Sequence, residues 1–380
     1  MSNKLVALLT NNDDDVYCFR LELIQAILKN GYRLLISCPD GPKFNVMAEN
    51  GLKQNKNFIF DGVSIDRRGM NVIKDGMLFL HYLHLFNQYR PSVILTYTAK
   101  PNVYGSLAAH FLHIPVINNI TGFGSVFNKR HWIQTIIMWM FKAAYKNSAC
   151  IMFQNEANMR LAFNRGLVAG KYKLLPGSGV NTDRFPLQAY PEGGNGIEGE
   201  VVVFNYIGRI LSDKGVDDYI EAAKIIKKRY PKTEFNMIGF IEPTELHYET
   251  ELKDLEKKGI IQYRGSQKDI KPWIARSHAL IHPSVYGEGM SNVLLENASS
   301  GRFLITTDNP GCRETVEHGV NGFIFPGSNV EDLVRNIELF LQMKNEMRCM
   351  KGKAGRQKVA REFNREIVIK VYLEEINRIC

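Results

Sequence analysis

The chain has 380 residues, of which 45% are hydrophobic and 23% charged. These proportions exclude a disordered protein. No run reaches the roughly 18–20 apolar residues of a membrane span. The length predicts two domains of roughly 150–190 residues. The net charge of +9 is uneven, because residues 1–185 hold 21 basic and 11 acidic residues whereas residues 186–380 hold 27 and 28.

The first half alternates short apolar runs with longer amphipathic segments, which is typical of βαβ units around a parallel sheet. Amphipathic helices are expected at 16–30 and 78–88. The first apolar run is short and carboxylates follow it, which indicates a strand rather than a signal peptide. Strands are expected at residues 5–9, 34–37, 57–60, 93–97, 116–120, 150–153 and 173–175.

Residues 189–199 contain four glycines and a proline, a composition typical of a linker or an exposed loop. The alternation restarts after them, with strands expected at 201–207, 234–238, 260–263, 279–281, 303–306 and 323–325, and helices at 214–229, 246–257 and from 330 onward. We therefore place an N-terminal domain at 1–185, a linker at 186–200, a second domain at 201–360, and a C-terminal helix at 361–380 that packs back on the first domain.

The expected fold is α/β, with two Rossmann-like, doubly wound domains facing a central cleft. Neither half shows a G-x-G-x-x-G fingerprint after its first strand, so NAD or FAD binding is not supported. The six cysteines are scattered without a C-x-x-C pair, which indicates a reducing, cytoplasmic compartment and no zinc site.

A turn bearing two cations follows the expected strand 201–207. Gly208 ends the strand, Arg209 and Lys214 follow five residues apart, and a helix begins at about Lys214. A doubly wound fold binds phosphate at such a place, beside a helix start. Arginine clamps phosphate oxygens with its fork and lysine acts as a point charge. Two solvated cations around an ordinary turn are the alternative.

Two glutamates, Glu288 and Glu296, lie eight residues apart in the segment 283–301. Glu288 falls in a glycine-rich loop, and Ser291 is the expected N-cap of the helix that carries Glu296. A carboxylate accepts hydrogen bonds from both hydroxyls of a vicinal diol, so the pair is suited to a sugar and a ribose. The helix N-terminus between them would face the diphosphate. Ordinary loop and helix charges are the alternative.

These motifs resemble those of the large retaining glycosyltransferase family 4, whose members have the GT-B fold. The resemblance covers nearly the whole chain and rests on Gly208-Arg209-x4-Lys214-Gly215, Glu288-x7-Glu296 and Asn321-Gly322-Phe323. Within the family, two further segments are similar to the bacterial branch that extends polyprenyl-diphosphate-linked sugars for capsule, O-antigen or protein glycans: Thr121-Gly-Phe-Gly124 and Cys312-Arg-Glu-Thr-Val316.

The resemblance implies a UDP-sugar donor bound by the C-terminal domain and transferred with retention. Arg209 and Lys214 would stabilise the departing diphosphate, Glu288 would contact donor-sugar hydroxyls, and Glu296 would hold the ribose. No metal or other cofactor is expected, because preorganised cations lower the cost of charge separation. The other expected donor-binding residues are Gly208, Gly265, Gly289, Met290, Ser291, Asn292 and Val293.

The sequence departs from the family pattern at one place in the N-terminal domain. Many family members carry a histidine after the strand equivalent to 116–120, whereas residues 118–124 here contain none. No catalytic acid or base is therefore assigned there. The residues left to position the acceptor or the sugar are Thr121, Gly122, Gly124 and, on the first helix, Arg20.

Residues 129–146 combine two tryptophans, a tyrosine and an apolar block with flanking basic residues. This pattern suits a bilayer interface, and a buried Rossmann helix is the alternative.

The basic first half also indicates an anionic partner. The expected partners are a UDP-sugar, a lipid-linked saccharide and the cytoplasmic surface of the inner membrane, and the protein is expected to be cytoplasmic and peripheral. No RNA-binding or helix-turn-helix signal supports nucleic acid.

The predicted function is transfer of a hexose or N-acetylhexosamine from a UDP-sugar to a polyprenyl-diphosphate-linked saccharide. A UDP-sugar 2-epimerase is one alternative and needs carboxylates and a histidine in the cleft. A non-catalytic sugar-nucleotide-binding protein is another.

Asp13–Asp15 contains the DxD pattern that binds Mn²⁺ in glycosyltransferases of the other main fold, but its place after the first strand favours an acid cluster at a helix start.

Overall fold

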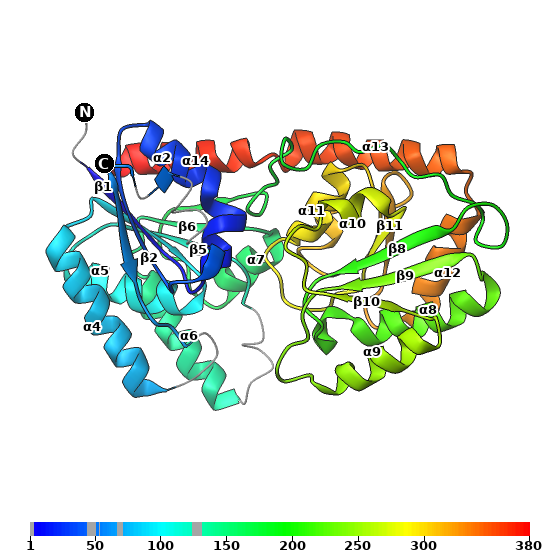
Figure 1. Cartoon of the computed structure of the whole chain (residues 1–380). Helices are drawn as coiled ribbons and strands as arrows, with labels where there is room; N and C mark the ends of the chain where they lie inside the picture. Colours follow the sequence, from blue (N-terminus) through cyan, green and yellow to red (C-terminus); the bar gives the residue numbers. More distant parts are fainter. Residues whose placement is uncertain (1–3, 44–50, 53, 67–70, 124–130) are drawn as a thin grey trace. The chain divides into compact units, whose positions relative to one another are not determined.

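The computed structural model describes residues 4–43, 51–52, 54–66, 71–123 and 131–380. The chain divides into two compact units, each with its own parallel sheet (Figure 1). Unit 1 comprises Met1–Ser178 and Glu366–Cys380, and unit 2 comprises Gly179–Arg365. None of the helices in the described part of the chain combines the length and apolar character needed to cross a bilayer.

The sheet of unit 1 has the strand order β3-β2-β1-β4-β5-β6-β7, and its described pairs are all parallel. The central strands are buried throughout and consist largely of aliphatic residues, as expected for a parallel sheet covered on both faces. The strands are β1 (Leu5–Leu9), β2 (Arg33–Cys38), β3 (Phe58–Gly62), β4 (Val93–Tyr97), β5 (Val116–Ile120), β6 (Cys150–Phe153) and β7 (Tyr172–Leu174).

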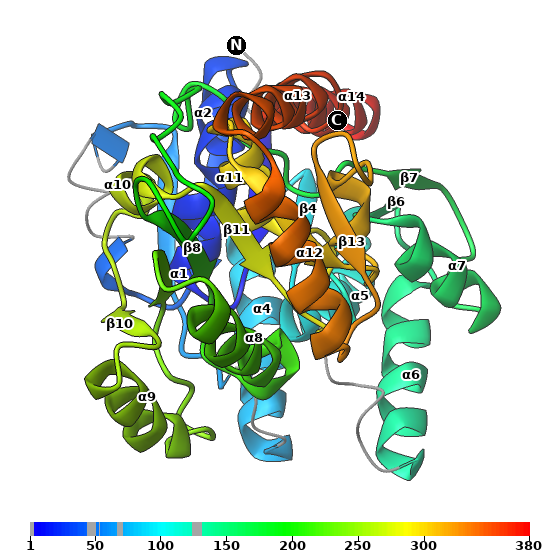
Figure 2. The same ribbon diagram turned by 90° about the vertical axis from the view of Figure 1, so that its right-hand side faces the viewer.

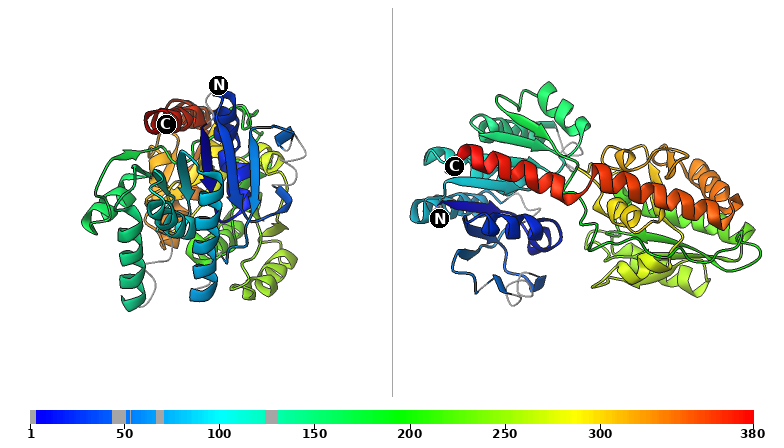
Figure 3. Two further views of the ribbon diagram at one scale, coloured as in Figure 1. Left: turned by 90° about the vertical axis from the view of Figure 1, so that its left-hand side faces the viewer. Right: turned by 90° about the horizontal axis from the view of Figure 1, so that it is seen from above.

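Helices cover both faces of this sheet. Alternate residues of β1 separate the two cores: Val6 and Leu8 pack with α2 (Leu21–Lys29) and α14 (Arg365–Ile379), whereas Leu5 and Leu9 pack with α4 (Val72–Tyr89) and α5 (Ser106–Phe111). Figure 3 shows the N-terminal ends of α4 and α6 extending beyond the sheet on one side of unit 1. The other helical segments of unit 1 are α1 (Asp13–Asp15), η1 (Val16–Arg20), η3 (Pro101–Gly105), α6 (His131–Tyr145) and α7 (Glu156–Asn164).

Helix α4 begins six residues before the start expected at 78. The side chain of Asn71 accepts hydrogen bonds from the amides of Ile73 and Lys74 at 3.0 and 3.1 Å and caps the helix. The first turns are exposed and apolar, so their periodicity does not mark a buried face. The capping residue, and not the apolar pattern, determines where this helix starts.

The sheet of unit 2 has the order β10-β9-β8-β11-β12-β13 and is also parallel in its described pairs. Figure 2 looks onto this unit and shows α8 and α12 side by side. Its strands are β8 (Val202–Ile207), β9 (Thr233–Ile238), β10 (Gln262–Gly265), β11 (Ala279–His282), β12 (Phe303–Thr307) and β13 (Gly322–Phe325). Its helices are η5 (Ser212–Lys214), α8 (Val216–Arg229), α9 (His247–Lys257), α10 (Lys271–Arg276), α11 (Asn292–Ser299), η6 (Arg313–Thr315), α12 (Val330–Gln342) and α13 (Asn345–Glu362).

Residues 186–200, expected to form a linker, belong to unit 2 instead, and the chain divides after Ser178. The Tyr190 hydroxyl donates to the carbonyl of His278 at 2.7 Å, and Arg302 donates to the carbonyl of Ala189 at 2.7 Å. The glycines and proline correctly indicated irregular backbone. They did not indicate a free segment, because this backbone is tied down by side chains from elsewhere in unit 2.

His278 is a buried part of this packing, with 1% of its surface exposed. Its Nδ1 accepts a hydrogen bond from the amide of Val203 at 3.0 Å, so the proton resides on Nε2, which faces the carbonyl of Glu192 at 3.0 Å. Burial lowers the pKa of His278 from 6.5 to about 4. The folded protein therefore keeps this ring neutral at neutral pH.

We expect the free energy of unfolding to fall as pH decreases from 6.5 towards 4, because the unfolded chain binds a proton on His278 that the folded chain excludes. Over this pH range the free energy of unfolding loses the contribution of neutral His278, which is roughly 3 kcal/mol. Urea unfolding at several pH values should show a smaller loss in His278→Asn, whose side-chain oxygen can still accept from Val203. The control is His318→Asn, at an exposed histidine whose Nδ1 accepts from Ile324 at 3.0 Å. An unchanged pH slope in His278→Asn would contradict this account.

Candidate functional site

In both sheets the strand order reverses beside the first strand, between β1 and β4 in unit 1 and between β8 and β11 in unit 2. The connections that leave two such strands diverge to opposite faces of the sheet, and ligands bind where they part. In unit 2 the segment after β8 carries Arg209 and Lys214, and the segment after β11 carries Glu288. The topology thus brings together two motifs that lie about 75 residues apart in the sequence.

Glycines allow the ends of β8, β9 and β10 to approach closely. Gly239 has φ +149°, and a Cβ built there would lie 1.7 Å from the carbonyl oxygen of Gly208. Its amide donates to the carbonyl of Gly265 at 2.9 Å. Gly265 has φ +62° and open space where a side chain would be. The role of Gly265 in donor binding stays a prediction.

Arg209 and Lys214 converge on one aromatic ring. The guanidinium carbon of Arg209 lies 5.4 Å from the ring centroid of Tyr286, and the ammonium of Lys214 lies 5.0 Å from it. Arg209 also pairs with the buried Glu242 at 2.7 Å. Although burial opposes it, this carboxylate helps hold the pKa of Arg209 above its ordinary value. Two cationic side chains therefore share one small region.

Lys214 forms an ion pair with Glu288, and both side chains are almost buried, with 11% and 12% exposed. Ser284 donates a further hydrogen bond to Glu288 at 3.2 Å. Burial alone would raise the pKa of Glu288, but the charge of Lys214 and the hydrogen bond from His282 outweigh it and lower that pKa. Glu288 is thus kept ionised as a fixed acceptor for hydroxyl groups.

Gly215 allows the two segments to meet. It has φ +72°, and a Cβ built there would lie 2.1 Å from the carbonyl oxygen of Pro283. A residue with a side chain would push the turn that carries Lys214 away from the loop that carries Glu288. The glycine in the first motif is therefore required by the close approach of the second.

Ser291 does not cap the helix as the sequence suggests. It occupies the N-cap position of α11, but its hydroxyl makes no capping hydrogen bond. The hydroxyl lies 3.1 Å from Nε2 of the buried His282, which is also 3.5 Å from the carboxylate of Glu288. With the Ser291 side chain turned away, the helix start keeps its positive end available to an anion.

The other predicted donor residues lie along the same segment. Met290 is 6% exposed and packs in the core, so only its backbone can face a ligand. Gly289 abuts Gly311, where a Cβ would lie 2.9 Å from the Gly289 carbonyl oxygen. Asn292 and Val293 form the first turn of α11 and are partly exposed. Glu296 lies on the same helix, half-buried.

Sequence reasoning missed four residues of this site. Glu242 and Tyr286 hold Arg209, and His282 links Glu288 to Ser291. Cys312 completes a group with His282 and Glu288 whose ligand atoms lie within 4.8 Å of one another. Their common signal is position, since each follows or ends a strand of this sheet.

The group of His282, Glu288 and Cys312 does not fit a metal ion. The Lys214 ammonium already neutralises Glu288. Burial raises the pKa of the Cys312 thiol far above its ordinary value, so the thiol is neutral beside Glu288. A cation would face both a neutral thiol and an adjacent positive charge.

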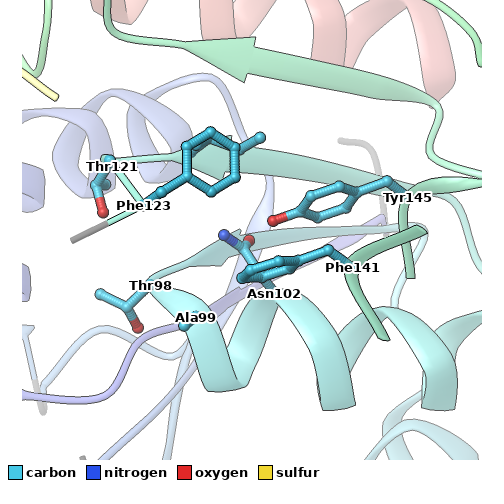
Figure 4. A pocket seen from close by; sticks show the side chains of 9 residues that line it. Thr98, Ala99, Asn102, Thr121, Phe123, Phe141 and Tyr145 are labelled. Atoms are coloured by element: carbon cyan, nitrogen blue, oxygen red, sulfur yellow. The ribbon is translucent and has the colours of Figure 1, made fainter. Parts of the chain in front are cut away.

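In unit 1, Thr121 and Gly122 line a small pocket at the carboxyl end of β5 (Figure 4). Gly122 has φ +117°, which only glycine adopts without strain. Gly124, the third residue expected to position the acceptor or sugar, lies outside the described residues.

Arg20 lies in the interior of unit 1, with 1% of its surface exposed. Its guanidinium carbon lies 4.0 Å from the ring centroid of Tyr97, and it donates to the hydroxyl of Ser178 at 3.0 Å. It also approaches Asp15 at 3.8 Å, and Asp15 accepts from Thr10 at 2.9 Å. The last acid of the Asp13–Asp15 cluster therefore has a structural partner.

Comparison with known proteins agrees with this architecture. A family model described as glycosyl transferase 4-like matches residues 6–155, and one described as glycosyl transferases group 1 matches residues 193–358. The N,N'-diacetylbacillosaminyl-diphospho-undecaprenol alpha-1,3-N-acetylgalactosaminyltransferase of Campylobacter jejuni is 23% identical over 386 residues and 98% of each chain is covered. The capsular polysaccharide biosynthesis glycosyltransferase CapM of Staphylococcus aureus is 22% identical, covering 85% of this chain and 87% of its own.

Solved structures show the same fold. Anabaena HepE in complex with UDP and glucose matches with a TM-score of 0.79 at 15% identity, covering 99% of this chain and 100% of its own. Sucrose-phosphate synthase from Thermosynechococcus elongatus matches with a TM-score of 0.77 at 17% identity, covering 99% and 98%. The two family matches and this fold show that the chain belongs to the glycosyltransferases of the GT-B fold, with a glycosyl transferase 4-like unit followed by a group 1 unit.

Proposed function

We propose that the protein is a retaining, metal-independent glycosyltransferase. It moves a hexose or N-acetylhexosamine from a UDP-sugar to a polyprenyl-diphosphate-linked saccharide in the synthesis of a bacterial surface polysaccharide or glycan. The observation that carries the proposal is the pair of cations around Tyr286. A chain of contacts from Lys214 to Glu288, His282 and Ser291 connects these cations to the start of α11.

The donor chemistry follows from these charges. A diphosphate leaving group gains negative charge as the glycosidic bond breaks, and fixed cations stabilise that charge without reorganising. Arg209 and Lys214 supply them, and the start of α11 adds the positive end of a helix. The crystal structure of HepE in complex with UDP, which shares this fold, supports a uridine nucleotide as the donor.

The remaining groups orient the donor and need no protein nucleophile. Ionised Glu288 accepts hydrogen bonds from donor-sugar hydroxyls, and Glu296 accepts them from the ribose. The acceptor's proton passes to the departing phosphate on the same face of the sugar. An α product formed from an α-linked nucleotide sugar retains its configuration, and the name of the C. jejuni relative specifies an α linkage.

The acceptor class is inferred from the same relative. Its name specifies an N-acetylated sugar on diphospho-undecaprenol, and the match covers 98% of both chains. We extend this acceptor class, a saccharide on a polyprenyl diphosphate, to the present chain. Unit 1 would hold it, since the motifs of unit 2 are occupied by the donor.

Binding and transfer assays test the proposal. A panel of UDP-sugars is titrated by calorimetry, and transfer to polyprenyl-diphosphate-linked sugars follows. Glu296→Ala is expected to weaken UDP binding by at least about tenfold, because hydrogen bonds to a charged group are lost. Glu331→Ala, at an exposed helix glutamate, is the control. Epimerised UDP-sugar without acceptor would support the 2-epimerase, and binding without turnover would support a non-catalytic protein.

The exposed ends of two helices of unit 1 support binding to a membrane. Ile73, Met77 and Leu80 on α4 repeat at helical spacing and are 76%, 65% and 63% exposed. Figures 1 and 3 show that α6 projects on the same side. There the exposed side chains with the same spacing are Trp132, Ile136 and Trp139, at 60%, 51% and 71%.

We call these six side chains the apolar tip of unit 1. Exposed Lys142 follows on α6 and exposed Lys146 comes directly after the helix, and the excess of basic residues in the first half adds attraction to anionic lipid. We propose that the apolar tip docks peripherally on the cytoplasmic face of the inner membrane, where a lipid-linked acceptor lies.

The variant Trp132→Ala/Trp139→Ala is expected to bind anionic phospholipid vesicles roughly tenfold or more weakly, because two large apolar side chains no longer enter the interface. Vesicle flotation measures the bound fraction at low and high salt, and high salt should release the wild-type protein. Leu339→Ala removes an exposed apolar side chain from unit 2 and is the control. Equal flotation of all three proteins would contradict the membrane role.

A further inference from the structure

The donor chemistry proposed above does not involve the pocket at the carboxyl end of β5 in unit 1. It lies between the loops that follow β4 and β5 and the C-terminal part of α6 (Figure 4). Its volume is about 30 Å³, whereas a water-sized group needs roughly 10–15 Å³. The pocket thus holds two or three non-hydrogen atoms, which is one substituent of a sugar and not a sugar ring.

Two aromatic rings form an apolar wall. Phe123 and Phe141 are 6% and 4% exposed and meet edge to face, with their ring centroids 6.0 Å apart. Phe141 in turn stacks on Tyr145 at 5.4 Å. Burial of a methyl group against such a wall is favourable, whereas burial of a bare hydroxyl there is unfavourable.

The floor of the pocket is polar and held in one orientation. Asn102 is 3% exposed, and its amide nitrogen donates to the carbonyl of Asn119 at 2.9 Å. Its amide oxygen accepts from the hydroxyl of Thr96 at 2.6 Å. Because a backbone carbonyl only accepts, the nitrogen and oxygen of Asn102 cannot exchange places.

Tyr145 presents a donor to this space. Its hydroxyl hydrogen-bonds the side chain of Asn102, and burial raises its pKa far above the ordinary value, so it stays a phenol. Figure 4 shows this hydroxyl pointing towards Asn102 from beside Phe141. As a phenol, the hydroxyl of Tyr145 can accept from one group and donate to another.

Backbone strain marks the same place. Thr98, which lines the pocket, has φ +67° although it is a β-branched residue. This conformation is unfavourable for such residues, and strained positions cluster where ligands bind.

We propose that the pocket receives the N-acetyl group of the acceptor's terminal sugar, an inference that rests on the proposed function. The acyl carbonyl accepts from Tyr145, the methyl group packs against Phe123 and Phe141, and the amide N–H donates to the hydroxyl of Thr121 at the rim. The three non-hydrogen atoms of an acetyl group match the space. A hydroxymethyl group would leave the aromatic wall uncovered, and a methyl group alone would leave the Tyr145 donor unpaired.

Matched acceptors test this inference. Polyprenyl-diphosphate sugars that carry either an acetamido group or a hydroxyl at one ring position are compared by kcat/KM, and the wild type is expected to prefer the acetamido acceptor at least about tenfold. Tyr145→Phe keeps the ring and removes the donor, and should lower kcat/KM about five- to tenfold for that acceptor only. Ala99→Leu narrows the pocket from an exposed rim position and should remove most of the preference.

In both variants, kcat/KM for the hydroxyl acceptor should stay within about twofold of the wild-type value. Transfer to this acceptor therefore shows that the variants are folded. Equal use of both acceptors by the wild type would overturn the inference and leave the proposed function intact. A preference that follows the hydroxymethyl group would also overturn it. Absence of transfer to any acceptor, with UDP-sugar still bound, would overturn the proposed function and the inference together.

Discussion

Replacing Lys214 with alanine is expected to lower kcat by about 10²–10³-fold, the loss seen when one preorganised group is removed from a developing negative charge. Lys214 is the more buried of the two cations and is held in place by Glu288. Single-turnover transfer measures the chemical step directly. Lys224→Ala removes an exposed lysine on α8 that pairs with Glu221 and is the control.

The same substitution leaves Glu288 ionised and buried without its partner. Removing one member of such a pair costs about 3–5 kcal/mol of stability, so reduced activity alone would not prove a catalytic role. The double variant Lys214→Met/Glu288→Gln removes both charges and should recover most of the stability. Its turnover should remain as low as that of Lys214→Ala. A double variant with wild-type turnover would exclude Lys214 from catalysis.

The second large effect is expected for Arg209→Ala, which should depress kcat by about 10²-fold while UDP binding changes only a few-fold. Glu242 and Tyr286 position the guanidinium, which clamps two phosphate oxygens as their charge grows. Steady-state kinetics and calorimetry on the same preparation separate the two quantities.

Arg209→Lys should restore little of the lost turnover, because an ammonium keeps the charge but lacks the planar fork. Arg229→Ala, which breaks an exposed pair with Glu338, is the matched control. If Arg209→Ala weakens UDP binding and leaves kcat unchanged, Arg209 binds the donor equally in the ground and transition states and the catalytic assignment is wrong.

Much of the fold was predictable because the strands are short, buried and apolar. Expected strands at 5–9, 93–97, 116–120 and 150–153 coincide with β1, β4, β5 and β6. Helix starts were harder, since α4 begins at its Asn71 cap, outside the amphipathic stretch. Residues 186–200 were wrong as a linker because composition reports backbone irregularity and not the packing partners of that backbone.

The site was predictable only in part. The spacing of Arg209, Lys214 and Glu288 identified groups that the structure brings to one place. The capping role expected for Ser291 was wrong because its hydroxyl pairs with His282, a competition that a local sequence pattern cannot register. Glu242 follows the neighbouring strand β9, so only the sheet order shows that it faces Arg209.

The sequence alone determined the alternation of strands and helices, the two motifs of unit 2 and the uneven charge, because periodicity and composition are local properties of the chain. Only the tertiary structure decided which charges meet, that the Ser291 side chain does not cap α11, and that Thr121 lines a pocket of about 30 Å³. Those features depend on which strands become neighbours. Strand order is set by packing of the whole sheet and not by any short segment.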